Sequence, residues 1–219
     1  MNKNIRNIIR GMFFVAFFSL WLSGNAQSWG RLLLLGLLVT PIWGRLYCGF
    51  ACPISSTIDL IGYFKPWRPT SKKHKEIFFD NKVRLITLLA SLALLITFIK
   101  TKFPVPFFVA LIPIGLVFTY LFGEAAWHRN CFIGTIYSLL GGISRKGYYI
   151  QNDLCLSCGK CEKICPSGCL EIKPTGVNNI DNKHCLICGK CQNVCPDENI
   201  VYGSLKNTKT KAVQKAFFD

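Results

Sequence analysis

The stretch Cys155-Leu-Ser-Cys158-Gly-Lys-Cys161-x3-Cys165-Pro166 recurs thirty residues later as Cys185-Leu-Ile-Cys188-Gly-Lys-Cys191-x3-Cys195-Pro196. Both copies follow the spacing C-x2-C-x2-C-x3-C-P. In each copy, three cysteines lie close enough in sequence to surround one metal centre. A proline after the fourth cysteine redirects the chain. Eight thiols at repeated offsets therefore indicate metal binding by a small, internally duplicated unit.

This spacing is that of bacterial-type ferredoxins with two clusters, in which the fourth cysteine of each copy ligates the other cluster. The alternative is two structural zinc sites, but zinc needs four ligands per site and rarely uses this order. We therefore predict two [4Fe–4S] clusters as cofactors. The predicted ligands are Cys155, Cys158, Cys161 and Cys195 for cluster 1, and Cys185, Cys188, Cys191 and Cys165 for cluster 2.

The composition divides the chain into two parts. Apolar residues make up 51% of the chain and crowd into residues 1–143, whereas most of the twelve cysteines follow residue 150. We expect an all-α membrane domain at 1–143, with about four transmembrane helices. An α+β two-cluster ferredoxin domain should follow at 144–205, with a basic tail at 206–219. Oxidised thiols cannot bind clusters, so the ferredoxin domain should face the reducing cytoplasm.

Four segments are candidates for crossing a bilayer, which takes about 20 largely apolar residues. They lie near 8–23, 31–47, 83–99 and 105–122. Two shorter apolar stretches, 54–64 and 132–143, are typical of helices that lie at the membrane interface. The first segment is also compatible with a cleaved signal peptide, since Gly24-Asn25-Ala26 offers small residues at the cleavage offsets. Either reading leaves the remaining topology unchanged.

The net charge of +15 does not indicate nucleic-acid binding, because residues 145–205 hold seven basic and six acidic residues. The excess positive charge lies at the N-terminus, in the loop 65–84 and in the tail. The positive-inside rule then places both termini and the ferredoxin domain in the cytoplasm. We expect a multi-pass protein of a bacterial or archaeal cytoplasmic membrane, in contact with membrane lipid and without a nucleic-acid partner.

Three further cysteines lie at the predicted cytoplasmic ends of apolar segments. Cys48 and Cys52 belong to the motif Cys48-Gly-Phe-Ala-Cys52-Pro53, and Cys131 follows the fourth segment. With these motifs, the chain from about residue 30 to 205 resembles the membrane-bound polyferredoxins of the NapH type, with relatives in NosR and the RdxA/CcoG proteins. The resemblance implies four helices, a C-x3-C-P motif after the second and the fourth helix, and a two-cluster ferredoxin domain.

The second of these motifs departs from the family pattern. Trp127 and Phe132 stand where that pattern has cysteine and proline, so only Cys131 matches. The set Cys48, Cys52 and Cys131 can form an additional iron–sulfur or metal site, with His128 as a further ligand, or a redox thiol pair. The alternative is that these cysteines pack as small buried hydrophobic side chains.

Other chemically interesting residues have simpler interpretations. Cys169 is expected to be a packed free thiol, and His184 a surface or packing residue. Lys160 and Lys190, which follow the ligand-loop glycines, are expected to be solvated. Ile150 and Ile180, at matched repeat positions, suggest short strands that lead into each ligand loop.

The sequence indicates electron transfer without a substrate pocket, and no catalytic residue is assigned. It contains neither a G-x-G-x-x-G nor a P-loop motif. Resemblance to NapH implies transfer between a quinol- or flavin-linked membrane partner and a redox protein partner through the two clusters. Resemblance to RdxA/CcoG implies the alternative, an assembly or maturation factor for a respiratory metalloenzyme that reduces metal or thiols.

Overall fold

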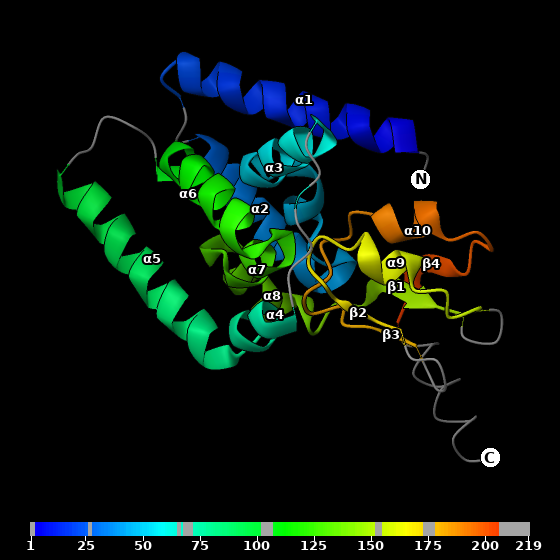
Figure 1. Ribbon diagram of the computed structural model, residues 1–219. Helices are drawn as coiled ribbons and strands as arrows, with labels where there is room; N and C mark the ends of the chain where they lie inside the picture. Colours follow the sequence, from blue (N-terminus) through cyan, green and yellow to red (C-terminus); the bar gives the residue numbers. More distant parts are fainter. Residues whose placement is uncertain are drawn as a thin grey trace.

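The computed structural model describes residues 3–25, 28–64, 67, 72–101, 107–151, 155–172 and 178–205. Most of these residues are helical, and a small region with short strands lies at one end of the molecule (Figure 1). The predicted basic tail 206–219 lies outside the described residues. So do residues 105–106 of the fourth predicted helix and residues 26–27 at the candidate cleavage position.

Four apolar helices form where the hydrophobic segments predicted them. They are α1 (Lys3–Leu22), α2 (Ser28–Trp43), α5 (Asn81–Thr101) and α6 (Phe107–Phe122). The second predicted helix, 31–47, is wrong at its C-terminal end. Gly44 has a left-handed φ of 77°, which ends α2 after Trp43. The chain then forms a short π-helix, η1 (Tyr47–Ala51).

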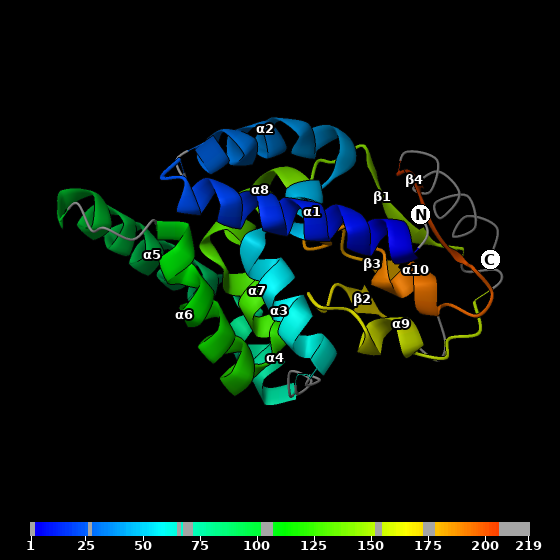
Figure 2. The same ribbon diagram turned by 90° about the horizontal axis from the view of Figure 1, so that it is seen from above.

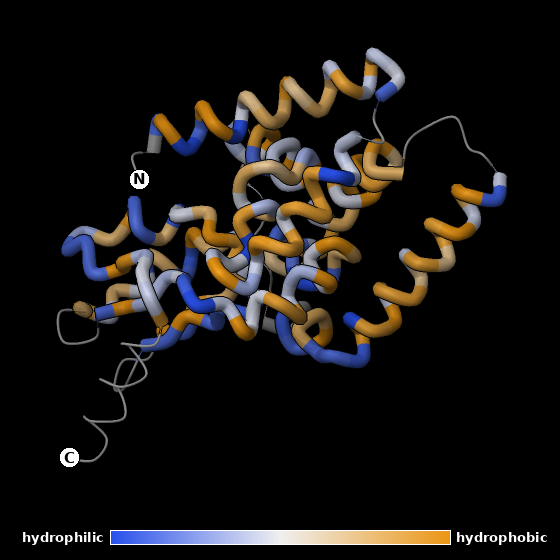
Figure 3. The backbone as a smooth tube through the Cα atoms, turned by 180° about the vertical axis from the view of Figure 1, so that it is seen from behind, coloured by the Kyte–Doolittle hydropathy of each residue, from blue (hydrophilic) through white to orange (hydrophobic). Residues whose placement is uncertain are grey.

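Two of the four apolar helices are long enough to cross a membrane. They are the 19-residue stretch Asn4–Leu22 of α1 and the 21-residue α5, of which only 6% is buried inside the protein. Hydrophobic residues dominate the middle of α5, with polar residues at its ends (Figure 3). The described parts of α2 and α6 have 16 residues each.

Four shorter helices fill the space between the apolar helices and the strand region. They are α3 (Pro53–Phe64), α4 (Lys72–Phe78), α7 (Glu124–Asn130) and α8 (Phe132–Gly141). The stretches predicted as interfacial correspond to α3 and α8, and each buries one face in the core. Ile58 of α3 and Tyr137 of α8 are fully buried, and the Tyr137 ring stacks on Tyr47 with centroids 5.4 Å apart.

The strand region is internally duplicated, as the repeated motif predicts. It contains β1 (Lys146–Ile150), α9 (Lys160–Lys163), β2 (Leu170–Glu171), β3 (Asn179–Ile180), α10 (Lys190–Val194) and β4 (Ile200–Ser204). β1 pairs antiparallel with β4 and places Ile150 opposite Ile200, while β2 pairs antiparallel with β3 and places Leu170 opposite Ile180. Each two-stranded sheet therefore joins the first strand of one copy to the last strand of the other.

The strand region packs against one end of the helical part. The C-terminal ends of α1 and α5 and the N-terminal ends of α2 and α6 point away from the strands (Figures 1 and 2). The N-terminal end of α1 instead lies near α10. Each of the four apolar helices therefore has one end that points away from the strand region. The ligand loops lie on the side of the other ends.

Candidate metal centre

The two ligand loops enclose two cavities, each lined by thiols from both copies of the motif. The outer cavity is lined by Cys155, Cys158, Cys161 and Cys195. The inner cavity is lined by Cys165, Cys185, Cys188 and Cys191, and by Cys169 in addition. The structure thus brings together the two predicted ligand sets, three consecutive cysteines from one copy and the fourth cysteine from the other.

The backbone around both cavities takes the same unusual path. Left-handed φ angles occur at Ser157, Gly159 and Gly168 in the first copy, and thirty residues later at Ile187, Gly189 and Glu198. Two of these positions, Ser157 and Ile187, immediately precede the second cysteine of each run, and non-glycine residues adopt this conformation at some cost. Because both copies repeat these strained conformations, the two loops are shaped to bind the same kind of group, one in each cavity.

The donor set fits an iron–sulfur cluster in each cavity. Four thiolates are the usual ligand set of a cluster, and N–H groups directed at the sulfurs tune the reduction potential of the cluster. Asn178 supplies such a donor in the outer cavity, with its Nδ2 3.4 Å from Cys155 Sγ. In the part of the chain that is described, no three His, Cys, Asp or Glu side chains converge on a site for a single metal ion.

The two cavities differ in their exposure to solvent. In the outer one, Cys158 is exposed and Cys155 is half-buried, while the neighbouring Leu156 is 71% exposed. In the inner one, Cys185, Cys188 and Cys191 are all buried. Burial raises the pKa of Cys188 and Cys191. Metal binding at the inner cavity therefore has to displace protons from these thiols.

The inner cavity lies directly against the helical part. A methyl group on Gly49 of η1 would meet the carbonyl oxygen of Leu186 at 2.2 Å, so only glycine allows this approach. Arg6 of α1 donates from Nη1 to the carbonyl oxygen of Cys188 at 3.0 Å. Arg10 donates from Nε to the Gly49 carbonyl oxygen at 2.5 Å. These contacts fix the ligand loop 185–191 onto the helices.

The three remaining predicted cysteines, Cys48, Cys52 and Cys131, are buried in one hydrophobic cluster at this boundary. Cys48 lies within the π-helix, an element that is frequent at functional sites. Cys52 immediately precedes α3 and Cys131 immediately precedes α8. Burial raises the pKa of Cys52, and interactions with Cys48 and Cys131 raise it further.

Backbone N–H groups and one buried arginine interact with these thiols. Burial raises the pKa of Cys131 to about 11, although hydrogen bonds from the backbone at Gly134 and Ile133 oppose the shift. Arg45, 1% exposed, reaches Cys48 Sγ with Nη2 at 3.8 Å and the carbonyl oxygen of His184 with Nη1 at 3.4 Å. A single buried guanidinium therefore bridges Cys48, of this group of thiols, and the start of the inner ligand loop.

His128 is directed toward a group of charges. Its Nε2 lies 3.7 Å from Glu124 Oε1, and Glu124 Oε1 in turn lies 3.6 Å from Lys190 Nζ. The expectation that Lys190 is solvated is wrong, because its ammonium is mostly buried in ion pairs with Asp59 and Glu124. Burial would lower the pKa of Lys190, but these two carboxylates hold it above its ordinary value.

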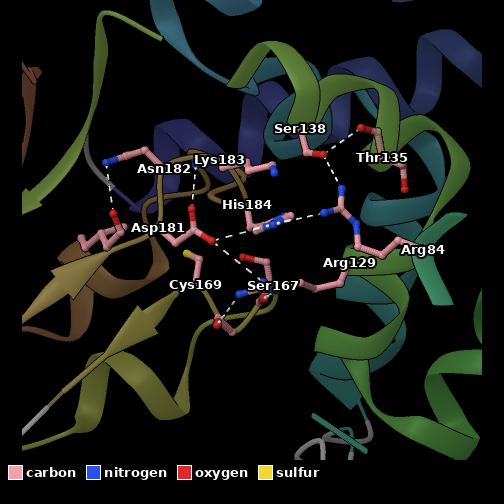
Figure 4. A network of polar contacts seen from close by, with 12 residues as sticks. Arg84, Arg129, Thr135, Ser138, Ser167, Cys169, Asp181, Asn182, Lys183 and His184 are labelled. Atoms are coloured by element: carbon pink, nitrogen blue, oxygen red, sulfur yellow. Dashed lines mark hydrogen bonds and ion pairs between the residues drawn. The ribbon is translucent and has the colours of Figure 1, made fainter. Parts of the chain in front are cut away.

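A second polar network joins the helices to the inner ligand loop (Figure 4). Arg84 of α5 contacts Ser138 Oγ at 2.5 Å and His184 Nε2 at 3.4 Å, and His184 Nε2 lies 3.8 Å from Asp181. Burial and the charges of Arg129 and Arg84 lower the pKa of His184 to about 2, so the imidazole is neutral. Of the two interpretations given for His184, surface or packing, the structure shows packing, because the side chain is buried.

The sequence reasoning missed the buried arginines that make these contacts. It counted Arg6, Arg10 and Arg84 only as part of the positive charge of the N-terminus and the loop 65–84, yet their exposed fractions are only 6–8%. The available signal was the spacing of Arg6 and Arg10, which places both on one face of α1. Arg45 and Arg129 gave no comparable signal, because their partners lie far away in sequence.

The fold and the thiol-lined cavities define an iron–sulfur protein of the ferredoxin type, whose chemistry is electron transfer. Comparison with known proteins agrees. Residues 154–200 match the family model of a 4Fe-4S dicluster domain, and residues 25–71, which include Cys48 and Cys52, match that of a 4Fe-4S binding domain.

One curated relative is the methylamine utilization ferredoxin-type protein MauN of Paracoccus denitrificans (strain Pd 1222). It is 29% identical to this chain, and the match covers 61% of this chain and 52% of the relative. The chain therefore spans about half the length of the curated relative that it matches. No solved structure matches this chain.

Proposed function

We propose that the chain is a membrane-anchored electron-transfer protein in which eight cysteines hold two [4Fe–4S] clusters. The observation that carries this proposal is the lining of the two cavities. Cys155, Cys158, Cys161 and Cys195 would hold the outer cluster, and Cys185, Cys188, Cys191 and Cys165 the inner one. When bound, such clusters accept and release single electrons without a substrate site.

The chain's own residues give the two sites different environments. The exposure of Cys158 leaves the outer site open to solvent. The inner site is shielded from water by the helices, and Arg6 and Lys190 place positive charge beside its loop. Positive charge and hydrogen bonds stabilise the more negative, reduced form of a cluster. Exclusion of water acts in the opposite direction, so the two sites should differ in reduction potential.

Membrane anchoring is supported by the apolar helices. α5 has no charged residue between Arg84 and Lys100 and leaves Ile86, Ile96 and Ile99 more than half exposed. In water this helix would expose a large apolar surface, whereas in lipid it needs no partner. Helices α1, α2, α5 and α6 would together cross the cytoplasmic membrane, with the ligand loops on the cytoplasmic side.

The partners follow from the position of the two sites. The outer site is open to a cytoplasmic redox protein. The inner site faces Cys48, Cys52 and Cys131, and beyond them the membrane, where a quinol- or flavin-linked partner would exchange electrons. Resemblance to the NapH-type polyferredoxins supports this arrangement, and so does the ferredoxin-type character of the curated relative.

The thiols of Cys48, Cys52 and Cys131 would form an additional metal or redox site between the inner cluster and the membrane. Their burial in one cluster and the match of residues 25–71 to a 4Fe-4S binding domain support this role. Iron analysis of a Cys48→Ala variant tests it. The iron content per chain should fall relative to the parent protein, and an unchanged content excludes an iron site there.

The main proposal is tested on the full chain, purified anaerobically from membranes. It should contain about eight iron atoms and about eight labile sulfides in the ferredoxin part, and give a paramagnetic signal after dithionite reduction. It should also remain in membranes washed with alkaline carbonate. Colourless protein without labile sulfide would contradict cluster binding, and release by carbonate would contradict the anchor.

Deletion of the gene distinguishes electron transfer from a maturation role. Electron transfer predicts that electron flow stops while the partner enzyme keeps its metal. Loss of metal from the partner enzyme would indicate maturation instead.

A further inference from the structure

The inner cavity contains one thiol more than a four-ligand cluster needs. Cys169 lines it together with Cys165, Cys185, Cys188 and Cys191, and is itself only 3% exposed. Its Sγ lies 3.5 Å from Cys165 Sγ. Cys169 therefore lines the same cavity as the four predicted ligands and contacts one of them, Cys165.

A compact turn holds Cys169 in this place. The Gly168 N–H donates to the Cys165 carbonyl oxygen at 3.3 Å, and the left-handed φ of 58° at Gly168 turns the next residue back toward the cavity. Arg129 of α7 clamps the turn from outside, donating from Nε to the Ser167 carbonyl oxygen at 3.1 Å and from Nη2 to that of Gly168 at 3.0 Å. Figure 4 shows Cys169 beside this turn, near Asp181.

The outer cavity offers an internal comparison. Its equivalent of Cys165 is Cys195, and the residue that corresponds to Cys169 is Asn199. The backbones at these two positions are held alike, because the Asp181 N–H donates to the Cys169 carbonyl oxygen at 2.8 Å and the Gln151 N–H donates to that of Asn199 at 2.9 Å. The two sites thus share one geometry and differ in whether a fifth thiol is present.

We propose that Cys169 is a reserve ligand of the inner cluster, able to replace Cys165 as the fourth thiolate. The inference rests on the proposed cluster binding at this site. The exchange is redox-neutral. With a cluster bound, Cys169 would supply the thiolate in place of Cys165, and the proton released by the Cys169 thiol would be balanced by one taken up by the Cys165 thiolate. The buried position of Cys169 keeps water away from the iron during the exchange.

The experiment compares matched alanine variants of the full chain, purified anaerobically in detergent. Alanine is used because a serine oxygen can itself bind iron. Cys165→Ala should keep the iron and labile sulfide content of the parent protein, since Cys169 takes over. Cys195→Ala should lose about four iron atoms, because Asn199 supplies no thiol. The double variant C165A/C169A should also lose about four, whereas Cys169→Ala alone should lose none.

Spectroscopy provides a second measurement. In Cys165→Ala the dithionite-reduced spectrum should show two interacting clusters with an altered inner signal, since one ligand has changed. Loss of the inner cluster from Cys165→Ala to the same extent as from the double variant would overturn the proposal. A parent protein without any cluster would instead overturn the proposed function, so the two failures can be told apart.

Discussion

Lys190 of α10 and Asp59 of α3 form an ion pair across the boundary between the strand region and the helices, with 2.5 Å between Nζ and Oδ1. The same carboxylate pairs through Oδ2 with Arg10 of α1. The residues of the Lys190 pair are 131 positions apart in sequence. One side chain of α3 thus ties the inner ligand loop to α3 and α1 of the helical part, next to the predicted ligands Cys188 and Cys191.

Replacing Asp59 with asparagine should loosen this junction. The variant leaves two mostly buried cations, Arg10 and Lys190, without their shared carboxylate. Losing the charged partner of such a group costs about 3 kcal/mol of the free energy of unfolding. Thermal loss of the visible absorbance of the clusters in detergent measures the effect. Glu76→Gln, a matched change at an exposed position of α4, should leave this transition unchanged.

The same carboxylate should make stability depend on pH. Burial alone would raise the pKa of Asp59, but the charges of Lys190 and Arg10 outweigh it and lower the pKa below its ordinary value. The unfolded chain then binds a proton at a higher pH than the fold does, so stability is full above about pH 4 and falls as the pH drops below that value.

This pH effect is measured as the difference in unfolding midpoint between the parent protein and Asp59→Asn, followed by circular dichroism from pH 7 to 3. Acid damage to the clusters is common to both proteins and cancels in the difference. The difference should shrink below about pH 4. A difference that stays constant to pH 3 would show that the Asp59 pKa is not held down by its partners.

Sequence alone predicted the features that depend on local pattern. The duplicated cysteine spacing predicted the paired loops, and runs of apolar residues predicted α1, α2, α5 and α6 to within a few residues. It did not predict η1, α7 or the burial of Lys190. These depend on partners far away in the chain, as in the case of Asp59, and no periodic pattern records such a contact. The close approach of Gly49 to Leu186 was hidden for the same reason.

That approach gives a steric prediction. In Gly49→Ala the added methyl group would lie 2.2 Å from the Leu186 carbonyl oxygen, so the ligand loop has to move away from η1. Overpacking of this kind costs about 1–3 kcal/mol. The variant should lose its clusters at a lower temperature and be cleaved faster by protease between the helices and the strand region.

Gly30→Ala in α2 is the matched control, because a methyl group there meets no atom within 4 Å. The control should retain its clusters like the parent protein. Equal behaviour of the two variants would mean that the loop 185–191 does not rest on η1.

The duplicated geometry also predicts a gain of function at the outer site. Asn199 occupies the position that Cys169 has in the other copy, and its carbonyl oxygen accepts an equivalent backbone hydrogen bond from Gln151, the residue after β1. Introducing a thiol there, as Asn199→Cys in a Cys195→Ala background, should restore the iron that Cys195→Ala loses, about four atoms per chain. Iron and labile sulfide analysis measures the recovery, and Asn199→Ser in the same background is the control. Recovery with cysteine alone would show that a thiol four residues after the fourth ligand suffices to complete a cluster in this fold.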